Sequence, residues 1–394
     1  MPYNFDEIIS RKGTNNVKHD LVQKVFGTDD IIPMWVADMD FKSPDFVVEA
    51  IKKRCEHEFF GYTFAGEGYY NAIIKWLENR YNLSATQENL HFIPGIVAGI
   101  AYCIQTFTKE NDKILIQTPV YPPFINLPKK NNRELVCSKL KIENGRFTID
   151  FDDFAEKVKG CKLFILANPH NPGGTIWTKE ELRQIAHICH QNNVIVIADE
   201  IHADLVLPGF KHNSFASVSQ EAKDCSITFI APSKTFNIAG FSSSVCCIFN
   251  QEIREKYYGF LNSNDIANGN ILAYTVCEAA FTHGEEWLNE LTNYLQKNVD
   301  YLKTFFETHL PMLNVMIPLA SYLVWIDFNA LGMTQKQLSK FIIEEAKVGL
   351  NSGTDFGEDY EGFMRMNIGC PLSILKTALN NIYLAIKNLN KQYE

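Results

Sequence analysis

Lys234 stands where a lysine could do covalent chemistry. It follows a short apolar run, Ile227 to Ala231, that stops at Pro232, and β-branched and aromatic residues in such a run are typical of a buried strand entering a loop. A lysine is costly to bury without a partner or a task. At the end of a sheet strand it can lose its proton and form a Schiff base with an aldehyde. A solvated loop lysine is the simpler alternative, so the neighbouring segments must decide.

A candidate anion site follows an earlier run, residues 90–93. The run leads through Gly95 into an apolar, helix-like stretch that begins at Ile96 and Val97. Free backbone amides at the start of a helix bind anions, and a glycine lets the backbone approach a phosphate closely. By itself the signal is weak, because glycine precedes many helices that bind nothing.

Tyr121 lies in a proline-rich loop after the run 113–117. Prolines stiffen this loop, so that Tyr121 could be held flat against a planar ring. A surface turn with a packed tyrosine is the alternative.

Two further runs end in polar groups. Residues 162–167 lead into Asn168-Pro-His-Asn171-Pro-Gly-Gly, and residues 194–198 lead into Asp199-Glu-Ile-His202. A carboxylate at the end of a fully buried strand needs a cationic or hydrogen-bonding partner, and a protonated pyridine nitrogen is such a partner.

These runs alternate with helical patterns, which predicts an α/β fold with a mostly parallel sheet covered on both faces. Thr178 and Glu181 have the spacing of a capping box and predict the start of one covering helix. Ligands of such sheets bind beyond the carboxyl ends of the strands. We therefore expect the groups described above to meet at one edge.

Composition narrows the class of ligand. The chain has 394 residues, 46% of them hydrophobic, and a net charge of −9, which argues against a nucleic-acid partner and favours a small molecule. The N-terminus lacks the features of a signal peptide and no segment has the apolar length of a membrane span, so we expect a cytoplasmic protein without a membrane partner.

Neither cysteines nor histidines predict a metal site. The ten cysteines include no Cys-x-x-Cys pair and are expected to be reduced thiols in the core. His187 and His190 lie three residues apart, but without a suitably spaced acidic residue a partly exposed helix face is the better interpretation.

Three segments in order, 168–174, 198–202 and 231–240, resemble those of the fold-type I enzymes that use pyridoxal 5′-phosphate (PLP), and the resemblance spans essentially the whole chain. The chain is most similar to the subgroup of cystathionine β-lyases and cysteine-S-conjugate β-lyases, whose Trp-Val-Ala-Asp-Met-Asp-Phe segment stands here at residues 35–41. Segments 60–62 and 119–124 fit the same subgroup. The resemblance implies a large PLP-binding domain with a mostly parallel sheet between helices, and a smaller α+β domain.

The resemblance also implies roles for individual residues around the cofactor. Lys234 would bind the cofactor's aldehyde and later carry the Cα proton of the substrate. Asp199 would pair with the pyridine nitrogen, and Tyr121 would stack on the ring. Asn171 would hydrogen-bond the phenolic oxygen beside the substrate, and His202 would lie near the same edge.

The remaining implied contacts concern the phosphate and the substrate. Ser233 and the backbone amides around Ile96 and Val97 would bind the phosphate. Tyr62 would reach the phosphate of the neighbouring subunit, which requires a homodimer with shared active sites. Arg365 would take the carboxylate of an amino-acid substrate with its guanidinium fork. Without the resemblance, an arginine on a solvated strand face would be the preferred interpretation.

Both chain ends are expected to build the small domain, from residues 1–44 and 283–394, around the large domain of residues 45–282. A strand over 322–328 and a last helix over 373–389 belong to this expectation.

Two departures from the aminotransferases bear on function. Many of those enzymes have a tyrosine where this chain has His202, and an arginine where it has Ser242. The missing arginine leaves open how the charge of the phosphate is balanced, and the missing tyrosine favours a lyase.

We therefore expect a PLP-dependent carbon–sulfur β-lyase that cleaves L-cystathionine, L-cystine or a related cysteine S-conjugate to a thiol, pyruvate and ammonia. The alternatives are a PLP-dependent aminotransferase and a PLP-binding regulatory protein with incidental lyase activity. The residues do not specify the thiol side of the substrate.

Overall fold

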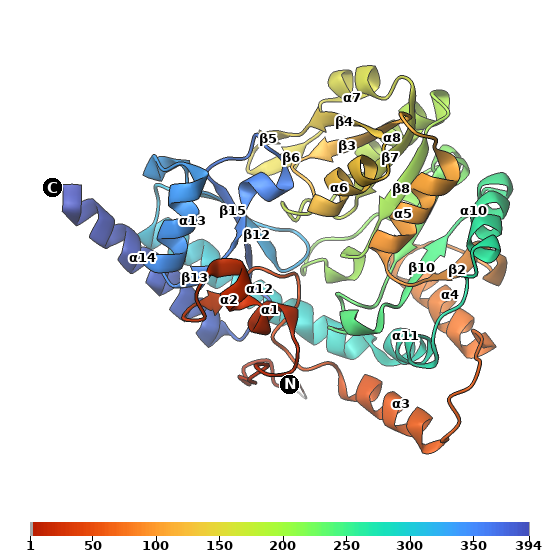
Figure 1. Ribbon diagram of the computed structural model, residues 1–394, viewed down its shortest axis with the longest axis horizontal. Helices are drawn as coiled ribbons and strands as arrows, with labels where there is room; N and C mark the ends of the chain where they lie inside the picture. The colour runs from red at the N-terminus through yellow and green to blue at the C-terminus, as the bar shows by residue number, and fades with distance from the viewer. Residues whose placement is uncertain (1–2, 394) are drawn as a thin grey trace.

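The computed structural model describes residues 3–393, and side chains as far as residue 389. Figure 1 shows a large sheet with its helices on one side of the molecule and a smaller sheet with its own helices on the other. The predicted α/β fold is confirmed.

The large sheet has seven strands, and only β10 runs antiparallel to its neighbours. The strands are short and mostly apolar, as expected where both faces are covered. The strands predicted from the apolar runs are confirmed to within a residue or two. In order across the sheet the seven strands are β2 (Leu90–Ile93), β10 (Ser244–Cys247), β9 (Ser226–Ile230), β8 (Ile195–Asp199), β7 (Cys161–Ala167), β3 (Lys113–Thr118) and β4 (Glu134–Lys139). Strands β10 and β4 lie outside the prediction.

Helices cover both faces of this sheet because successive side chains of a strand point to opposite sides. Leu115 and Phe164 pack on one face with residues of α7, α8 and α9, whereas Ile116 and Ile165 pack on the other with residues of α5, α6 and α10. The helices are α5 (Ile96–Phe107), α6 (Pro122–Lys130), α7 (Phe151–Lys157), α8 (Lys179–Gln191), α9 (Gln220–Asp224) and α10 (Gln251–Ser263). The predicted capping box at the start of α8 is confirmed by reciprocal hydrogen bonds between Thr178 and Glu181.

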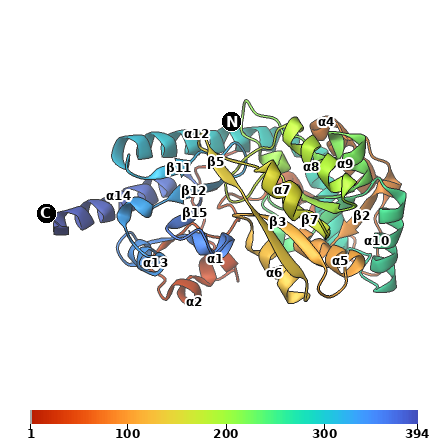
Figure 2. The ribbon, with the colours of Figure 1, turned by 90° about the horizontal axis from the view of Figure 1, so that it is seen from above.

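The smaller sheet is antiparallel and comes from the last third of the chain. Its order is β11 (Asn314–Met316), β12 (Leu323–Asp327), β15 (Phe363–Asn367) and β14 (Asn351–Ser352). A pair of two-residue strands, β1 (Ile32–Pro33) and β13 (Val348–Gly349), brings the N-terminal segment beside it. The helices here are α12 (Glu285–His309), α13 (Gln335–Glu344) and α14 (Leu372–Tyr393), and Figure 2 shows α12 and α14 as the two long helices of this part. The predicted strand over 322–328 and the predicted last helix are confirmed.

The two sheets share one buried core. One buried hydrophobic cluster contains residues of α4, α11, α12, β12 and α14, so the core is continuous across the domain boundary expected near residue 282, and the division into domains remains a prediction. The remaining elements are α1 (Val17–Asp20), α2 (Val22–Phe26), α3 (Asp45–Glu56), α4 (Glu67–Tyr81), α11 (Ile271–His283), the hairpin β5 (Lys141–Glu143) and β6 (Arg146–Thr148), and the 3-10 turns η1 (Gln87–Asn89), η2 (Ala203–Leu205), η3 (Phe215–Ser217), η4 (Ala239–Phe241), η5 (Asn329–Leu331) and η6 (Gly353–Phe356).

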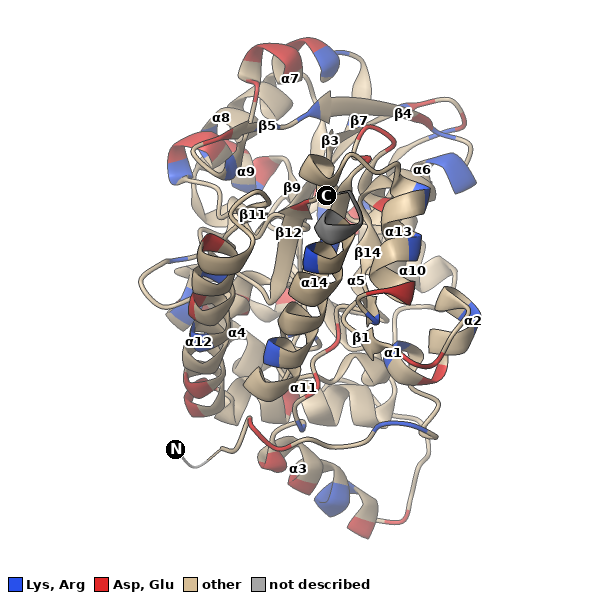
Figure 3. Cartoon of the chain, turned by 90° about the vertical axis from the view of Figure 1, so that its left-hand side faces the viewer, with Lys and Arg blue, Asp and Glu red and all other residues tan. Residues whose placement is uncertain are grey.

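The surface carries both signs of charge. On the side drawn in Figure 3, acidic and basic residues are mixed along α3 and α12, whereas the charged residues of α14 are lysines. Within residues 3–393, no helix combines the length and the apolar character needed to cross a bilayer.

Candidate active site

The carboxyl ends of five strands, β2, β3, β7, β8 and β9, open onto one cavity of about 240 Å³. The structure thus brings together most of the side chains and amides singled out from the sequence, because parallel strands end at the same edge of a sheet. Those that line the cavity are Ile96, Val97, Tyr121, Asn171, Asp199, His202, Ser233 and Lys234.

Lys234 reaches the cavity from the loop after β9. Its Nζ donates a hydrogen bond to the carbonyl oxygen of Ala37 at 2.6 Å. Burial lowers the pKa of the Lys234 amine, and the nearby positive charge of Arg365 lowers it further. The charges of Asp38 and Asp199 act in the opposite direction, and the net shift is downward. Because Lys234 lines the cavity, the alternative of a solvated loop lysine is wrong.

Asp199 is the last residue of β8 and is buried beside the cavity. Its Oδ1 accepts a hydrogen bond from the backbone N–H of Ile201 at 3.0 Å. Burial raises the pKa of Asp199 to about 7, because among the described residues no cation forms an ion pair with it. A protonated ring nitrogen is the kind of partner that would keep this carboxylate ionised.

Glu200 points away from Asp199 and holds the neighbouring loop in place. Its Oε2 pairs with Nε2 of His212 at 3.0 Å, and its Oε1 accepts hydrogen bonds from Nδ2 of Asn168 at 3.1 Å and from the backbone N–H of Phe215 at 2.7 Å. The two adjacent carboxylates thus do different things: Asp199 faces the cavity, and Glu200 anchors the Asn-Pro loop that follows β7.

His202 is buried at the same edge, and none of the residues that the structure describes forms a hydrogen bond with its Nδ1. Burial lowers the pKa of His202 to about 3, and the charges of Lys234 and Arg365 act in the same direction. The imidazole therefore stays neutral at physiological pH. A neutral ring can present either a donor or an acceptor to a ligand.

The start of α5 has the features of an anion site. Gly95 precedes the helix with a φ of +105°, and a Cβ at this position would meet no atom within 4 Å, so the backbone is open to the cavity. Ser233, Ser242, Ser243 and Ser244 line the same cavity, and Lys234 is the only lysine or arginine that does so among the residues the structure describes. An anion here would be held mainly by amides and hydroxyls.

Arg365 approaches from β15 of the smaller sheet and is buried. Its Nη1 donates to Oδ1 of Asn171 at 3.0 Å, and its Nη2 donates to Oδ1 of Asn351 at 2.8 Å and to the carbonyl of Trp35 at 3.0 Å. Burial lowers the pKa of Arg365 to about 10, so the side chain remains charged at neutral pH. Its Nε has no partner within the described part of the chain, which leaves a buried donor available for a ligand.

The two predicted tyrosines occupy very different places. Tyr121 lies at the start of α6 beside the cavity, where burial raises the pKa of its hydroxyl. Tyr62 is fully exposed in the extended segment 57–66 and does not line the cavity. Within one chain, therefore, Tyr62 is the predicted site residue that the structure leaves apart from the others.

Sequence reasoning missed the backbone groups of the segment 35–41. This segment supplies the acceptors for Lys234 and Arg365, and Tyr322 from the start of β12 also donates to the carbonyl of Ala37, at 3.2 Å. The segment had been noted only as a mark of the subgroup. The contact between this segment and Lys234 leaves no signal in a single sequence, because almost two hundred residues separate the two in the chain.

The structure also bears on cysteines and metals. All ten cysteines are unpaired. Over residues 3–393 no group of three or more His, Cys, Asp and Glu side chains has an arrangement suited to a metal ion. His187 instead contacts Oε1 of Glu221 through its Nδ1 at 3.1 Å.

Comparison with known proteins agrees with the PLP-dependent family that the sequence resembles. The family described as "Aminotransferase class I and II" matches residues 29–382. The cystathionine beta-lyase PatB of Bacillus subtilis is 41% identical over 97% of this chain and 100% of its own.

Solved structures are also similar. The cystalysin structure from Treponema denticola, which contains a pyridoxal 5′-phosphate cofactor, has a TM-score of 0.95 and 34% identity, covering 99% of this chain and 100% of its own. The PLP-bound C-S lyase from Staphylococcus hominis has a TM-score of 0.90 and 37% identity, covering 97% and 98%. The predicted resemblance is confirmed, and the chain belongs to the aminotransferase class I and II family, with the fold of the fold-type I PLP-dependent enzymes.

Proposed function

We propose that the protein is a PLP-dependent carbon–sulfur β-lyase that cleaves L-cystathionine, L-cystine or a related cysteine S-conjugate to a thiol, pyruvate and ammonia. The observation that carries this proposal is that three groups meet at one sheet edge: a lysine with a lowered pKa, a buried carboxylate and a buried arginine. Among the described residues, the carboxylate has no cation in an ion pair with it and the Nε of the arginine has no hydrogen-bond partner. The relatives named as cystathionine β-lyases and C-S lyases support the choice of reaction.

The residues present fit PLP. The open backbone at Gly95 and the hydroxyl of Ser233 suit the phosphate, and the carboxylate of Asp199 suits a protonated ring nitrogen. The amine of Lys234 suits the aldehyde, and Tyr121 suits the face of the ring. When bound, PLP supplies a ring that withdraws electrons from the Cα of an attached amino acid.

The chain's own groups would then perform the remaining tasks. Arg365 would bind the α-carboxylate of the substrate and orient it, using the Nε donor that has no partner. The neutral amine of Lys234 would take the Cα proton and become an ammonium group. Asp199 would keep the ring nitrogen positively charged. With negative charge stabilised at Cα, a thiolate at Cβ is a feasible leaving group, and water converts the remaining fragment to pyruvate and ammonia.

An aminotransferase is the second candidate, and the description of the matching family favours it. The two reactions share every residue up to removal of the Cα proton. They differ in the next step, because an aminotransferase returns the proton to the cofactor and needs a keto acid as acceptor.

The test is to incubate the purified protein and PLP with L-cystathionine and with L-cystine, in the absence of any keto acid, and to follow pyruvate and thiol. We expect pyruvate and thiol in equal amounts from L-cystathionine. From L-cystine we expect pyruvate and an equal amount of a persulfide, which yields thiol when it is reduced. Turnover only after a keto acid is added would show an aminotransferase. Absence of turnover in both formats would favour a PLP-binding regulatory protein instead.

The site is also proposed to be shared in a homodimer. The segment that carries Tyr62 exposes Phe59, Phe60 and Phe64 as well, and an exposed run of aromatic side chains is typical of an interaction surface. Pairing of this surface with a second copy by two-fold symmetry would give two equivalent sites, each completed by the Tyr62 of the partner chain.

We further propose a cytoplasmic location, because ten unpaired cysteines are typical of proteins in reducing compartments. Fractionation of cells expressing the protein, with detection in the cytoplasmic fraction as the expected outcome, tests this part of the proposal.

A further inference from the structure

The segment Trp35–Phe41, which we call the strap, lies between the loop that carries Lys234 and the strand that carries Arg365. Its backbone binds both of these side chains, through the carbonyls of Ala37 and Trp35. Because most of its residues have no regular secondary structure, other groups must hold the strap in place.

Asn237 holds the strap from the side of the large sheet. Its Nδ2 donates to the carbonyls of Met39 at 3.0 Å and Phe41 at 2.7 Å, and its Oδ1 accepts from the backbone N–H of Met39 at 3.2 Å. Asn237 lies three residues after Lys234 and has a φ of +56°. The same turn therefore carries Lys234 and binds the strap.

Asn367 holds the strap from the smaller sheet. Its Nδ2 donates to the carbonyls of Val36 at 2.5 Å and Asp38 at 2.9 Å, and its backbone N–H donates to the carbonyl of Met34. The two asparagines thus bind strap residues on both sides of Ala37, and both are well placed to fix the direction of its carbonyl.

Charged groups of the N-terminal segment bind the two strap aspartates. Lys18, which is buried, donates through Nζ to Oδ2 of Asp40 at 2.6 Å and to the carbonyl of Asp38 at 3.0 Å. Arg11 pairs with Oδ2 of Asp38 at 2.7 Å, and Nε2 of His19 lies 3.0 Å from Oδ1 of Asp40.

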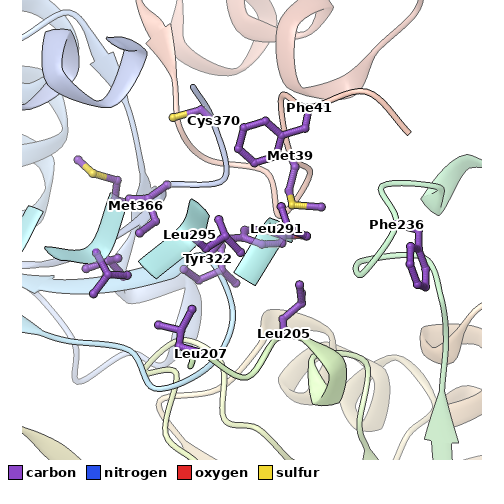
Figure 4. Close-up of a cluster of buried hydrophobic side chains, with 14 of the residues drawn as sticks. Met39, Phe41, Leu205, Leu207, Phe236, Leu291, Leu295, Tyr322, Met366 and Cys370 are labelled. Carbon is purple, nitrogen blue, oxygen red and sulfur yellow. The ribbon is translucent and has the colours of Figure 1, made fainter. Parts of the chain in front are cut away.

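The apolar side chains of the strap are anchored as well. Met39 and Phe41 belong to the buried cluster that includes Leu291 and Leu295 of α12 and Tyr322 (Figure 4). Hydrogen bonds, ion pairs and packing therefore all act on a segment of only seven residues. Such a segment cannot move without breaking many of these contacts.

The carbonyl of Ala37 is the group that this arrangement presents to the cavity. It accepts hydrogen bonds from the Lys234 amine at 2.6 Å and from the hydroxyl of Tyr322 at 3.2 Å. A primary amine that donates one N–H to a carbonyl keeps its lone pair, so it can still accept a proton from another direction.

We propose that Asn237 and Asn367 are positioning residues, which fix the strap so that the Ala37 carbonyl holds the Lys234 amine whenever this amine is not bonded to the cofactor. The inference rests on the proposed function, in which the lysine is released once the substrate's own amine has taken its place. Held at Ala37, the neutral amine takes the Cα proton with its lone pair and becomes an ammonium group, while the electron pair of the broken C–H bond stays on the substrate side.

The first arm of the test uses the full-length protein without cofactor. Asn237→Gly removes the hydrogen bonds between this side chain and the strap. Glycine tolerates the positive φ at this position, so the turn keeps its conformation. The matched control is Ser43→Ala, since the Ser43 hydroxyl donates to the carbonyl of Asn237 at 2.9 Å but does not touch the strap. Lys234 is labelled with a limiting amount of acetic anhydride and quantified by mass spectrometry. We expect labelling about fivefold faster in Asn237→Gly, because loss of one hydrogen bond frees the amine.

The second arm uses the PLP-loaded protein and L-alanine, which has a Cα proton but no thiolate to expel. Exchange of this proton in heavy water is followed by NMR. We expect the maximal exchange rate to fall about tenfold in Asn237→Gly and in Asn367→Ser, with the half-saturating alanine concentration within about twofold of wild type. General loss of structure would not separate these two quantities, and thermal unfolding of each variant checks for it.

Labelling and exchange rates in Asn237→Gly and Asn367→Ser equal to those of Ser43→Ala would overturn the inference. A wild-type protein that forms no bond between PLP and Lys234 would overturn the proposed function instead, and the cofactor-free arm would still report on the strap. Should Asn237→Gly fail to fold, Asn237→Asp, which loses both donors but keeps the acceptor, takes its place.

Discussion

Replacing Asp199 by asparagine should make the cofactor-free protein more stable at alkaline pH and the PLP-loaded enzyme much slower. Burial raises the pKa of Asp199 from 3.8 to about 7, so the folded protein favours the neutral carboxyl. Below the pKa that the carboxyl has in the unfolded chain, it is neutral in both the folded and the unfolded state. Its shifted pKa then has no effect on the free energy of unfolding. The cost in stability grows as the pH rises from about 4 to about 7 and is complete above the folded pKa.

The magnitude follows from the same shift. The difference of 7 − 3.8, about 3 pKa units at 1.36 kcal/mol each, corresponds to about 4 kcal/mol at high pH. Between about pH 5 and about pH 8.5, this shift lowers the free energy of unfolding by about 2 to 3 kcal/mol. Asparagine does not titrate, so Asp199→Asn escapes this loss, and the cost of burying its amide is the same at both pH values.

The assay is urea unfolding of both cofactor-free proteins at the two pH values and at one protein concentration, because the proposed dimer makes stability depend on concentration. We expect wild type to lose about 2 to 3 kcal/mol relative to Asp199→Asn on going to the higher pH. Adding PLP should restore the stability of wild type at the higher pH, because it gives the carboxylate a cationic partner. The variant should gain less stability from PLP and should turn over slowly. A stability difference that does not change with pH would refute the reasoning about Asp199.

Three further predictions concern other parts of the site. Arg365→Lys should lower kcat/KM for L-cystathionine by about ten- to a hundredfold in steady-state assays, since an ammonium group cannot replace a guanidinium fork, and an unchanged value would contradict carboxylate binding there. Gly95→Ala should weaken PLP binding about tenfold in a fluorescence titration, because φ is +105° at this position. The control Gly259→Ala should bind PLP normally, because this glycine lies in α10 away from the cavity, has no positive φ, and a Cβ there would meet no atom within 4 Å. Mixing inactive Tyr62→Ala with inactive Lys234→Ala under subunit exchange should restore up to about a quarter of wild-type activity, because one site of each mixed dimer carries neither change. No recovery despite demonstrated exchange, or an active monomer, would count against a shared site.

The sequence alone determined five of the seven strands of the large sheet, all except β4 and β10, and the groups at the ends of those five. Lys234, Asp199, Asn171 and Tyr121 each follow a short apolar run, and the rule that parallel strands end at one edge was enough to predict that they meet. Local signals of this kind survive in a single chain because they depend on residues close together in sequence. Motif order and spacing then led to the family and to PLP.

Only the tertiary structure decided how the two sheets are joined around the cavity. The hydrogen bond from Asn237 to Met39 joins residues 198 positions apart, and that from Asn367 to Val36 joins residues 331 positions apart. Neither contact is therefore visible in the local periodicity of the sequence. The shifted pKa values of Asp199 and Lys234 likewise come from burial, which depends on what packs around a side chain and not on its neighbours in the chain. The position of Arg365 is decided in the same way, because a strand arginine is expected to be solvent-exposed until the strap and Asn171 are folded against it.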